Sequence, residues 1–259
     1  MEPPMELIEN EETENGKLRL VADNQLPNDA PAIEKQFVNF MFFRVNPEWR
    51  KLNQETKKVY KSEFRKVFEE FSEQMLLFSY SLIGFDSKAD LMLWRIGNSL
   101  DLIQDMTAKI YRTNLGSYLE TTDNYLSVTR QMMFVAPDPD QAADGDRYRI
   151  TAGEKKYHFL YPCAKHSDWY EKTDEERDEL IKENFMVGQK FSNIRIHMTH
   201  AFGFSEQEYL ISFETDEPKD FLALAEEMRE TPASSLTMRG MPIYTCRLRT
   251  LSQCLDSLG

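Results

Sequence analysis

The second half of this 259-residue chain repeats the order of the first half, and this repeat is the strongest constraint on the fold. Residues 84–94 and 203–213 both begin with Gly-Phe and continue into an apolar run. With the same offset, Asp101 aligns with Asp220, each in the opening turn of an expected helix. An offset that holds over consecutive elements indicates an internal duplication.

Hydrophobic periodicity predicts the elements of both halves. Apolar and aromatic runs predict strands, and apolar residues at helical spacing predict helices. The first half gives strand, helix, strand, strand, helix, strand over residues 36–46, 54–73, 75–85, 89–96, 99–112 and 125–135. The second half gives the same order over residues 155–163, 174–185, 192–204, 208–214, 218–229 and 241–248, with Asp216 as the expected cap of the second helix.

Each half therefore has the β-α-β-β-α-β order of a ferredoxin-like unit. The apolar strands need their second face covered, and two such sheets packed together with helices outside satisfy that need. We expect an α+β chain with a duplicated ferredoxin-like fold, a dimeric α+β barrel with antiparallel sheets and outer helices. The expected divisions are a disordered acidic tail, an N-terminal half, a Pro- and Asp-rich linker, a C-terminal half and a short tail, over residues 1–30, 31–135, 136–150, 151–248 and 249–259.

Charge and cysteine content limit the classes of partner. The net charge of −13 disfavours nucleic acid and anionic lipid at long range. The apolar run 75–85 is too short to span a bilayer, and the first residues lack a secretory signal. The three cysteines have no metal-type spacing, so we expect three buried small side chains in a reduced, cytoplasmic protein.

The segment from Arg147 to Phe191 carries the most specific motifs. It contains KKYHFLYP with Lys165, then DWY, a charged helix that starts near EER, and MVG. Together with ADLMLW, the Gly203-Phe204 turn and EEMRETPAS, this order resembles the chlorite dismutase family over roughly residues 36–248, and its coproheme decarboxylase branch in particular. The resemblance implies a haem b or coproheme cofactor and a homo-oligomer, commonly a pentamer.

The resemblance also implies roles for individual residues. Coproheme decarboxylases remove two propionate carboxyl groups oxidatively with peroxide, and Tyr161 matches the tyrosine that serves as radical relay. The residues that match propionate-binding positions are Arg147 (or Arg149 in a shifted register), Lys165, Arg229 and Ser234. A phenol can lose a hydrogen atom, an ammonium neutralises a carboxylate, and a guanidinium fork binds one bidentately.

Each of these residues also has an ordinary structural reading. Tyr161 can be a strand tyrosine at the edge of the core, and Lys165 a solvated surface lysine. Arg229 lies where a cation stabilises the end of a helix.

The chain departs from the family pattern on the iron side of the pocket. The position of the iron-ligating histidine is Asn184, and an amide is not among the usual ligands of haem iron. The distal position, thirteen residues on, is His197. The absence of arginine there argues against chlorite dismutation, whereas a histidine can serve in acid–base chemistry or as a replacement ligand. His200 should point to the other face of the same strand.

Two hypotheses follow. The first is a haem- or coproheme-dependent oxidoreductase in which Tyr161 and His197 are catalytic. The second is a diverged, non-catalytic member that binds a tetrapyrrole or acts as an oligomeric interaction protein. Asn184 favours the second, and Tyr161 with Lys165 favours the first.

Overall fold

The computed structural model describes residues 35–129, 150, 152–204, 206–239 and 242–259. Its N-terminal half contains β1 (Phe37–Val45), α1 (Gln54–Phe71), β2 (Leu76–Ser81), β3 (Leu91–Gly97), α2 (Leu100–Arg112) and β4 (Leu119–Val128). Two short 3-10 turns, Pro47–Lys51 and Gly116–Tyr118, complete this half. The predicted order of elements is confirmed, but the last strand begins earlier than residue 125, and residues 130–135 of that prediction lie outside the described part.

The C-terminal half repeats the same order with small additions. It contains β5 (Tyr157–Lys165), α3 (Ser167–Tyr170), α4 (Asp174–Gln189), β6 (Arg195–His200), β7 (Tyr209–Thr215), α5 (Pro218–Glu230), α6 (Pro232–Ser235), β8 (Thr237–Arg239), β9 (Tyr244–Arg249) and α7 (Leu251–Ser257). The short elements α3, α6 and β8 were not predicted. The predicted acidic tail and almost all of the predicted linker lie outside the described residues.

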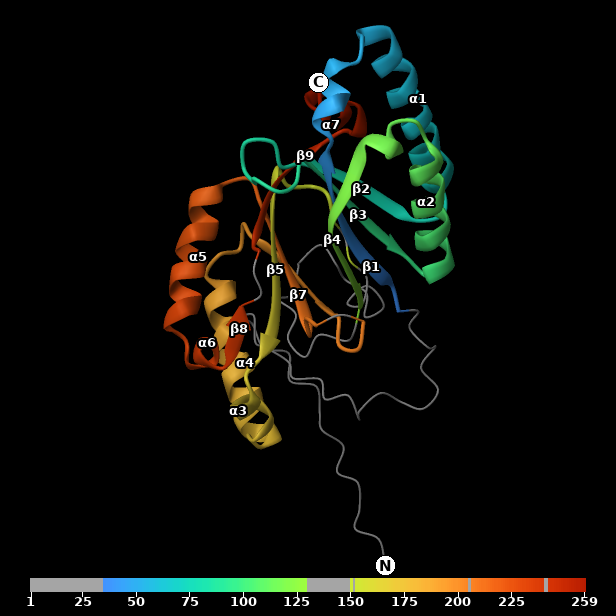
Figure 1. The fold of residues 1–259 in the computed structure, drawn as a ribbon. Coiled ribbons are helices and arrows are strands. Elements are labelled where there is room, and N and C mark those ends of the chain that lie inside the picture. The colour runs from blue at the N-terminus through green and yellow to red at the C-terminus, as the bar shows by residue number, and fades with distance from the viewer. Residues whose placement is uncertain (1–34, 130–149, 151, 205, 240–241) are drawn as a thin grey trace, which may run out of the picture.

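The described strands form one antiparallel sheet that closes on itself. The order is β7-β6-β4-β1-β3-β2-β9-β5-β8, and an additional pairing between β5 and β7 completes the ring. The two halves join where β2 pairs with β9 and where β4 pairs with β6. Closure buries the inner face of the sheet. The helices lie outside the sheet, as Figure 1 shows. The predicted duplicated ferredoxin-like barrel is therefore confirmed.

Local capping signals fix several helix boundaries. Ser99 accepts a hydrogen bond from the Asp101 backbone N–H at the start of α2. Thr173 and Glu176 form a capping box at the start of α4. The prediction that Asp216 caps α5 was wrong, because Glu217 occupies the N-cap position without a side-chain bond. Asp216 instead accepts from the backbone N–H of Lys156 over 3.0 Å and pairs with Lys155.

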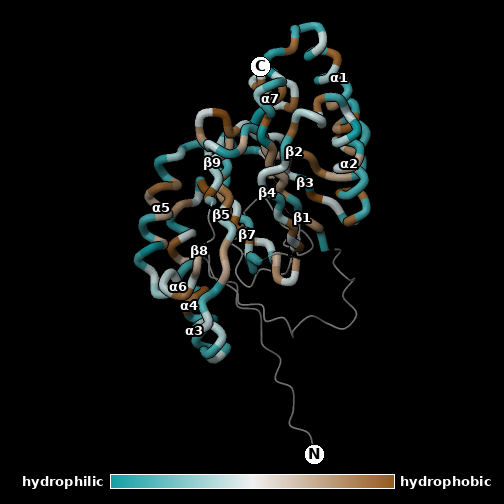
Figure 2. The backbone as a smooth tube through the Cα atoms, in the orientation of Figure 1, coloured by the Kyte–Doolittle hydropathy of each residue, from teal (hydrophilic) through white to brown (hydrophobic). Residues whose placement is uncertain are grey.

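The two helix layers differ in how completely they are buried. The helix-facing core of the N-terminal half includes many fully buried side chains, among them Phe43, Phe64, Leu93 and Met106. In the C-terminal half, the 16 residues of α4 are all described and none of them is buried. The outer helices carry hydrophilic residues along much of their length (Figure 2). The sheet of the C-terminal half is therefore less tightly covered than that of the N-terminal half.

Candidate functional site

Tyr161 faces the helix layer of the C-terminal half. Along β5, the side chains alternate: Phe159 and Tyr161 belong to the helix-side core, whereas Leu160 belongs to the interior of the barrel. The Tyr161 ring meets Phe213 edge-on at 5.5 Å and Phe221 edge-on at 5.8 Å. Its side chain is half-buried. The tyrosine thus lies at the edge of an aromatic core that is open enough to leave it partly accessible.

Lys165 lies at the end of the same strand. Its Nζ donates a hydrogen bond to Thr237 Oγ1 over 2.9 Å and lies 4.2 Å from the centre of the Trp169 ring. Its backbone N–H donates to Glu208 over 2.8 Å. Burial lowers the pKa of the Lys165 ammonium from its ordinary value. The lysine is therefore a half-buried, positioned cation and not a freely solvated one.

The Asn184 side chain is engaged within the helix layer. Its Oδ1 accepts a hydrogen bond of 2.7 Å from Thr231, which links α4 to the junction of α5 and α6. One turn later, a Cβ on Gly188 would lie 3.3 Å from the Ile196 side chain of β6. This turn of α4 therefore rests directly on the strand.

His197 faces away from Tyr161. Its neighbour Ile196 packs with the helix-side core, so the alternation of the strand turns His197 to the interior of the barrel. There, its Nε2 lies 3.2 Å from Glu214 Oε2. The sheet separates the two residues that the sequence predicted to be catalytic.

The remaining predicted residues are divided among α5, α6 and the undescribed segment. Arg229 is exposed in the last turn of α5. Ser234 lies on α6, where its backbone N–H donates to the carbonyl of Thr231. Arg147 and Arg149 lie outside the described residues. Along the chain, Arg229 and Ser234 lie on either side of Thr231, the residue that donates a hydrogen bond to Asn184.

Sequence reasoning missed the contacts that position these residues. Trp169 belongs to the quoted DWY motif, but only the tertiary structure shows that its ring lies under the Lys165 ammonium. Thr231 lies in the quoted EEMRETPAS motif and Thr237 in no motif, but the sequence did not indicate that they bind Asn184 and Lys165. Such partners are distant in sequence and cannot be read from spacing.

The residues at the predicted iron site do not fit a haem iron. Asn184 offers an amide that is already hydrogen-bonded, and His197 lies on the other face of the sheet. The carboxylate-binding side fits better, because Lys165 presents a positioned charge.

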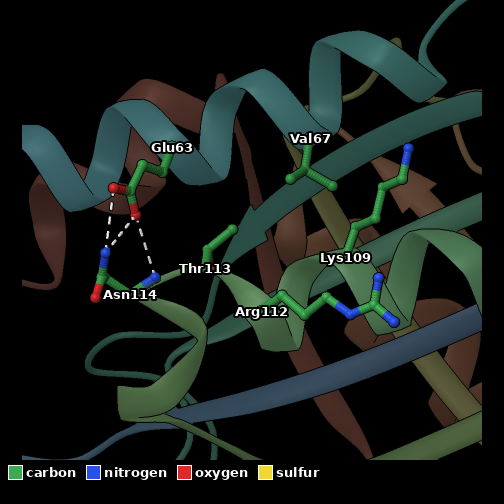
Figure 3. Close-up of a pocket in the computed structure, with 6 residues that line it drawn as sticks. All are labelled: Glu63, Val67, Lys109, Arg112, Thr113 and Asn114. Carbon is green, nitrogen blue, oxygen red and sulfur yellow. Dashed lines mark hydrogen bonds between the residues drawn. The ribbon is translucent and has the colours of Figure 1, made fainter.

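A separate hollow of about 350 Å³ lies between α1 and α2 in the N-terminal half (Figure 3). It is lined by Glu63, Val67, Lys109, Arg112, Thr113 and Asn114. The Glu63 carboxylate accepts hydrogen bonds from the backbone and side-chain nitrogens of Asn114, and Lys109 pairs with Glu70. Glu63 and Asn114 satisfy each other, and Lys109 is paired with a residue outside the hollow, so the hollow carries no ligand assignment.

The closed barrel of two ferredoxin-like units, with a helix layer over each half, defines an α+β barrel protein with a candidate site under α4 and α5. A family model described as chlorite dismutase matches residues 35–249. The chain belongs to the chlorite dismutase family.

Individual relatives are distant. The chain is 22% identical to the chlorite dismutase of Ideonella dechloratans over 230 residues, which cover 86% of this chain and 80% of that protein. It is 24% identical to the coproheme decarboxylase of Mycolicibacterium smegmatis over 169 residues, which cover 64% of this chain and 70% of that protein.

Solved structures agree on the fold. The structure of chlorite dismutase from Candidatus Nitrospira defluvii in complex with imidazole superposes with a TM-score of 0.77 at 21% identity, over 86% of this chain and 94% of that one. Across the residues that the structure describes, helices are too short or too polar to cross a bilayer.

Proposed function

We propose that this chain binds a tetrapyrrole that carries propionates in the helix layer of its C-terminal half, and that α4 contributes no bond to iron. The ligand is of the haem b or coproheme class. The observation that supports this proposal is the contrast between a positioned Lys165 and an engaged Asn184 within one layer.

The incomplete burial of the helix layer supports a flat apolar ligand. On the sheet side, Tyr161, Ile196 and Ile211 are only partly buried, and on the helix side so are Val187 and Met228. A ligand that covers partly exposed apolar side chains removes their surface from water. This burial stabilises the complex by roughly 25 cal/mol per Å² of apolar area. In the equivalent layer of the N-terminal half, fully buried apolar side chains outnumber partly buried ones, whereas in this layer the partly buried ones are the majority.

Lys165 supports recognition of the carboxylate end of the ligand. A half-buried ammonium attracts a carboxylate more strongly than a solvated one does, because the local dielectric is lower. Trp169 and Thr237 hold the lysine in place from two directions. The net charge of the chain is −13, so its long-range field repels an anionic ligand. A positioned cation offsets that repulsion at the binding site.

A titration with and without iron tests the proposal. Haemin, coproheme and metal-free coproporphyrin are added separately to the full chain, and the Soret band is followed. We expect saturable binding of all three, with coproheme and metal-free coproporphyrin differing by less than about tenfold, or ~1.4 kcal/mol. Saturable binding of the iron forms alone would contradict the proposal, and so would the absence of saturable binding.

A second candidate function is the peroxide-dependent decarboxylation of coproheme propionates. It is favoured by Tyr161, a partly accessible phenol four residues before Lys165 on the same strand. In that case Tyr161 would act as radical relay, with Arg147, Lys165, Arg229 and Ser234 holding the propionates. Peroxide is added to the coproheme-loaded protein and the porphyrin mass is measured. An unchanged mass argues for the binding function alone.

We further propose that the protein assembles as a homo-oligomer, a pentamer on the family resemblance, in a reducing cytoplasmic setting. All three cysteines are buried and none of them forms a disulfide, which fits a compartment that keeps thiols reduced. Light scattering coupled to gel filtration measures the subunit number directly, and a monomeric mass contradicts this proposal.

A further inference from the structure

The interior of the barrel contains a polar cluster on the face of the sheet opposite to Tyr161. It is formed by side chains from five different strands: Tyr80, Trp94, His158, His197 and Glu214. Trp94, His158 and Glu214 are completely buried. This cluster is separate from the layer proposed to bind a tetrapyrrole, because the sheet lies between them.

Glu214 is the centre of the cluster. Its carboxylate accepts hydrogen bonds from the Gly153 backbone N–H over 2.9 Å, from His197 over 3.2 Å and from Tyr80 over 3.4 Å. Burial raises the pKa of Glu214, but the hydrogen bond from His197 and the nearby His158 outweigh burial and hold the pKa below its ordinary value. The group is therefore an ionised carboxylate inside the barrel.

An ionised carboxylate fixes the tautomer of His197. A carboxylate only accepts, so the His197 Nε2 must carry the hydrogen. In the neutral ring, Nδ1 is then left as an acceptor. Glu214 and His197 thus form a carboxylate–imidazole pair with a defined orientation.

His158 lies beside this pair with unsatisfied nitrogens. Its ring stacks on Trp94 with centroids 4.9 Å apart and on Phe40 at 5.7 Å. Neither ring nitrogen of His158, nor Nε1 of Trp94, has a hydrogen-bond partner in the described part of the chain. Each buried unpaired polar group costs about 1–3 kcal/mol, so native proteins retain few of them without a reason.

The chemistry of the cluster selects the class of molecule that would pair with these nitrogens. A neutral imidazole presents one donor and one acceptor, and the indole presents one donor. The buried negative charge of Glu214 disfavours an anion. A metal ion is disfavoured because the described residues include no three-ligand group.

The geometry points to a second binding site inside the barrel, where His158, Trp94 and the Glu214–His197 pair bind one small uncharged molecule that both donates and accepts hydrogen bonds. The observations behind this interior site are independent of the tetrapyrrole proposal. A result that contradicts one of the two proposals therefore leaves the other in place.

The small number of histidines makes the site accessible to NMR. The chain has four histidines, so long-range ¹H–¹⁵N spectra of the histidine-labelled full chain can be assigned by substitution. Formamide is the uncharged probe, with acetate and tetramethylammonium as charged comparisons. We expect His197 as a single tautomer with the hydrogen on Nε2, and saturable shifts of both the His158 and the His197 nitrogens with formamide only.

Two variants and one control complete the test. His158→Phe should remove the saturable formamide shift of the His197 nitrogens while keeping an aromatic ring in the stack, and His166→Asn, at an exposed position, should leave that shift unchanged. If His158→Phe does not fold, Trp94→Phe removes the indole donor, together with part of the ring volume, and should weaken formamide binding at least about fivefold, the effect of one hydrogen bond of ~1 kcal/mol. The inference is overturned if formamide shifts neither His158 nor His197, if the shifts grow linearly with formamide, or if acetate gives equal shifts.

Discussion

The hydroxyl of Thr231 donates a 2.7 Å hydrogen bond to the side-chain oxygen of Asn184, and this bond ties α4 to the junction of α5 and α6. In the family resemblance, the position of Asn184 is that of the iron-ligating histidine. In this chain the side chain at that position is hydrogen-bonded to Thr231. The iron side and the carboxylate side of the candidate site can therefore be tested separately.

Replacing Asn184 by histidine should create a preference for iron. The imidazole would supply an axial ligand of the usual kind, so we expect Asn184→His to bind haemin at least about tenfold more tightly, or ~1.4 kcal/mol, and to shift its Soret band. Binding of metal-free coproporphyrin should not improve. Asn184→Ala is the matched control, and equal haemin affinities for the two variants would show that the position does not face the ligand.

Removing the charge of Lys165 should weaken binding of porphyrins that carry propionates. We expect Lys165→Met to bind metal-free coproporphyrin about tenfold more weakly, as for the loss of a partly buried charge-assisted hydrogen bond of ~1.5 kcal/mol. Binding of the corresponding methyl ester, which has no carboxylate, should change little. Lys190→Met removes an exposed lysine that pairs with Glu227 and should leave both affinities as they were.

Tyr161 distinguishes the two candidate functions. If the protein decarboxylates coproheme, Tyr161→Phe should abolish the peroxide-dependent mass change while coproheme affinity is retained, because phenylalanine keeps the edge-on contacts with Phe213 and Phe221. Mass spectrometry of the extracted porphyrin measures the product. Equal decarboxylation by the variant and the parent would exclude Tyr161 as the relay.

The stability of the fold should depend on pH through His158. Burial lowers the pKa of His158 from 6.5 to about 4, so the folded chain binds a proton less readily than the unfolded chain. Stability is therefore complete above pH 6.5 and falls as the pH decreases towards 4, by up to about 3 kcal/mol at ~1.4 kcal/mol per pKa unit. Urea unfolding between pH 7 and pH 4 should show a shallower loss for His158→Phe than for His166→Asn. Parallel plots of unfolding free energy against pH for the two variants would contradict the assignment of this pH dependence to His158.

Gly153 should tolerate no side chain. It has a positive φ of 81°, and a Cβ there would lie 2.1 Å from the Phe78 ring. We expect Gly153→Ala to lower the free energy of unfolding by about 2–4 kcal/mol, because backbone strain and a steric clash act together. Gly84→Ala is the matched control: φ is also 81°, but nothing lies within 4 Å, so only the strain of about 1 kcal/mol should appear. Similar losses in denaturant unfolding would show that Phe78 moves aside.

The sequence by itself determined the architecture of this protein. The constant offset between residues 84–94 and 203–213, together with the alternation of apolar runs, predicted the duplicated barrel, and the structure confirmed it. Local patterns of this kind are sufficient because the period of a strand or helix decides which face is buried. Capping was less certain. The prediction that Asp216 caps α5 was wrong, because Asp216 turns to Lys155 and Lys156, which are close only in the folded chain.

Only the tertiary structure decided how the candidate site residues are grouped. Spacing from Asn184 suggested that His197 faces the same pocket, but a register difference of one residue on β6 sends His197 to the interior and Ile196 to the helices. The partners Thr231 for Asn184 and Thr237 for Lys165 became visible only when elements far apart in the sequence came together. The side-chain period of a strand is two, so a single residue of register determines on which side of the barrel a histidine can act.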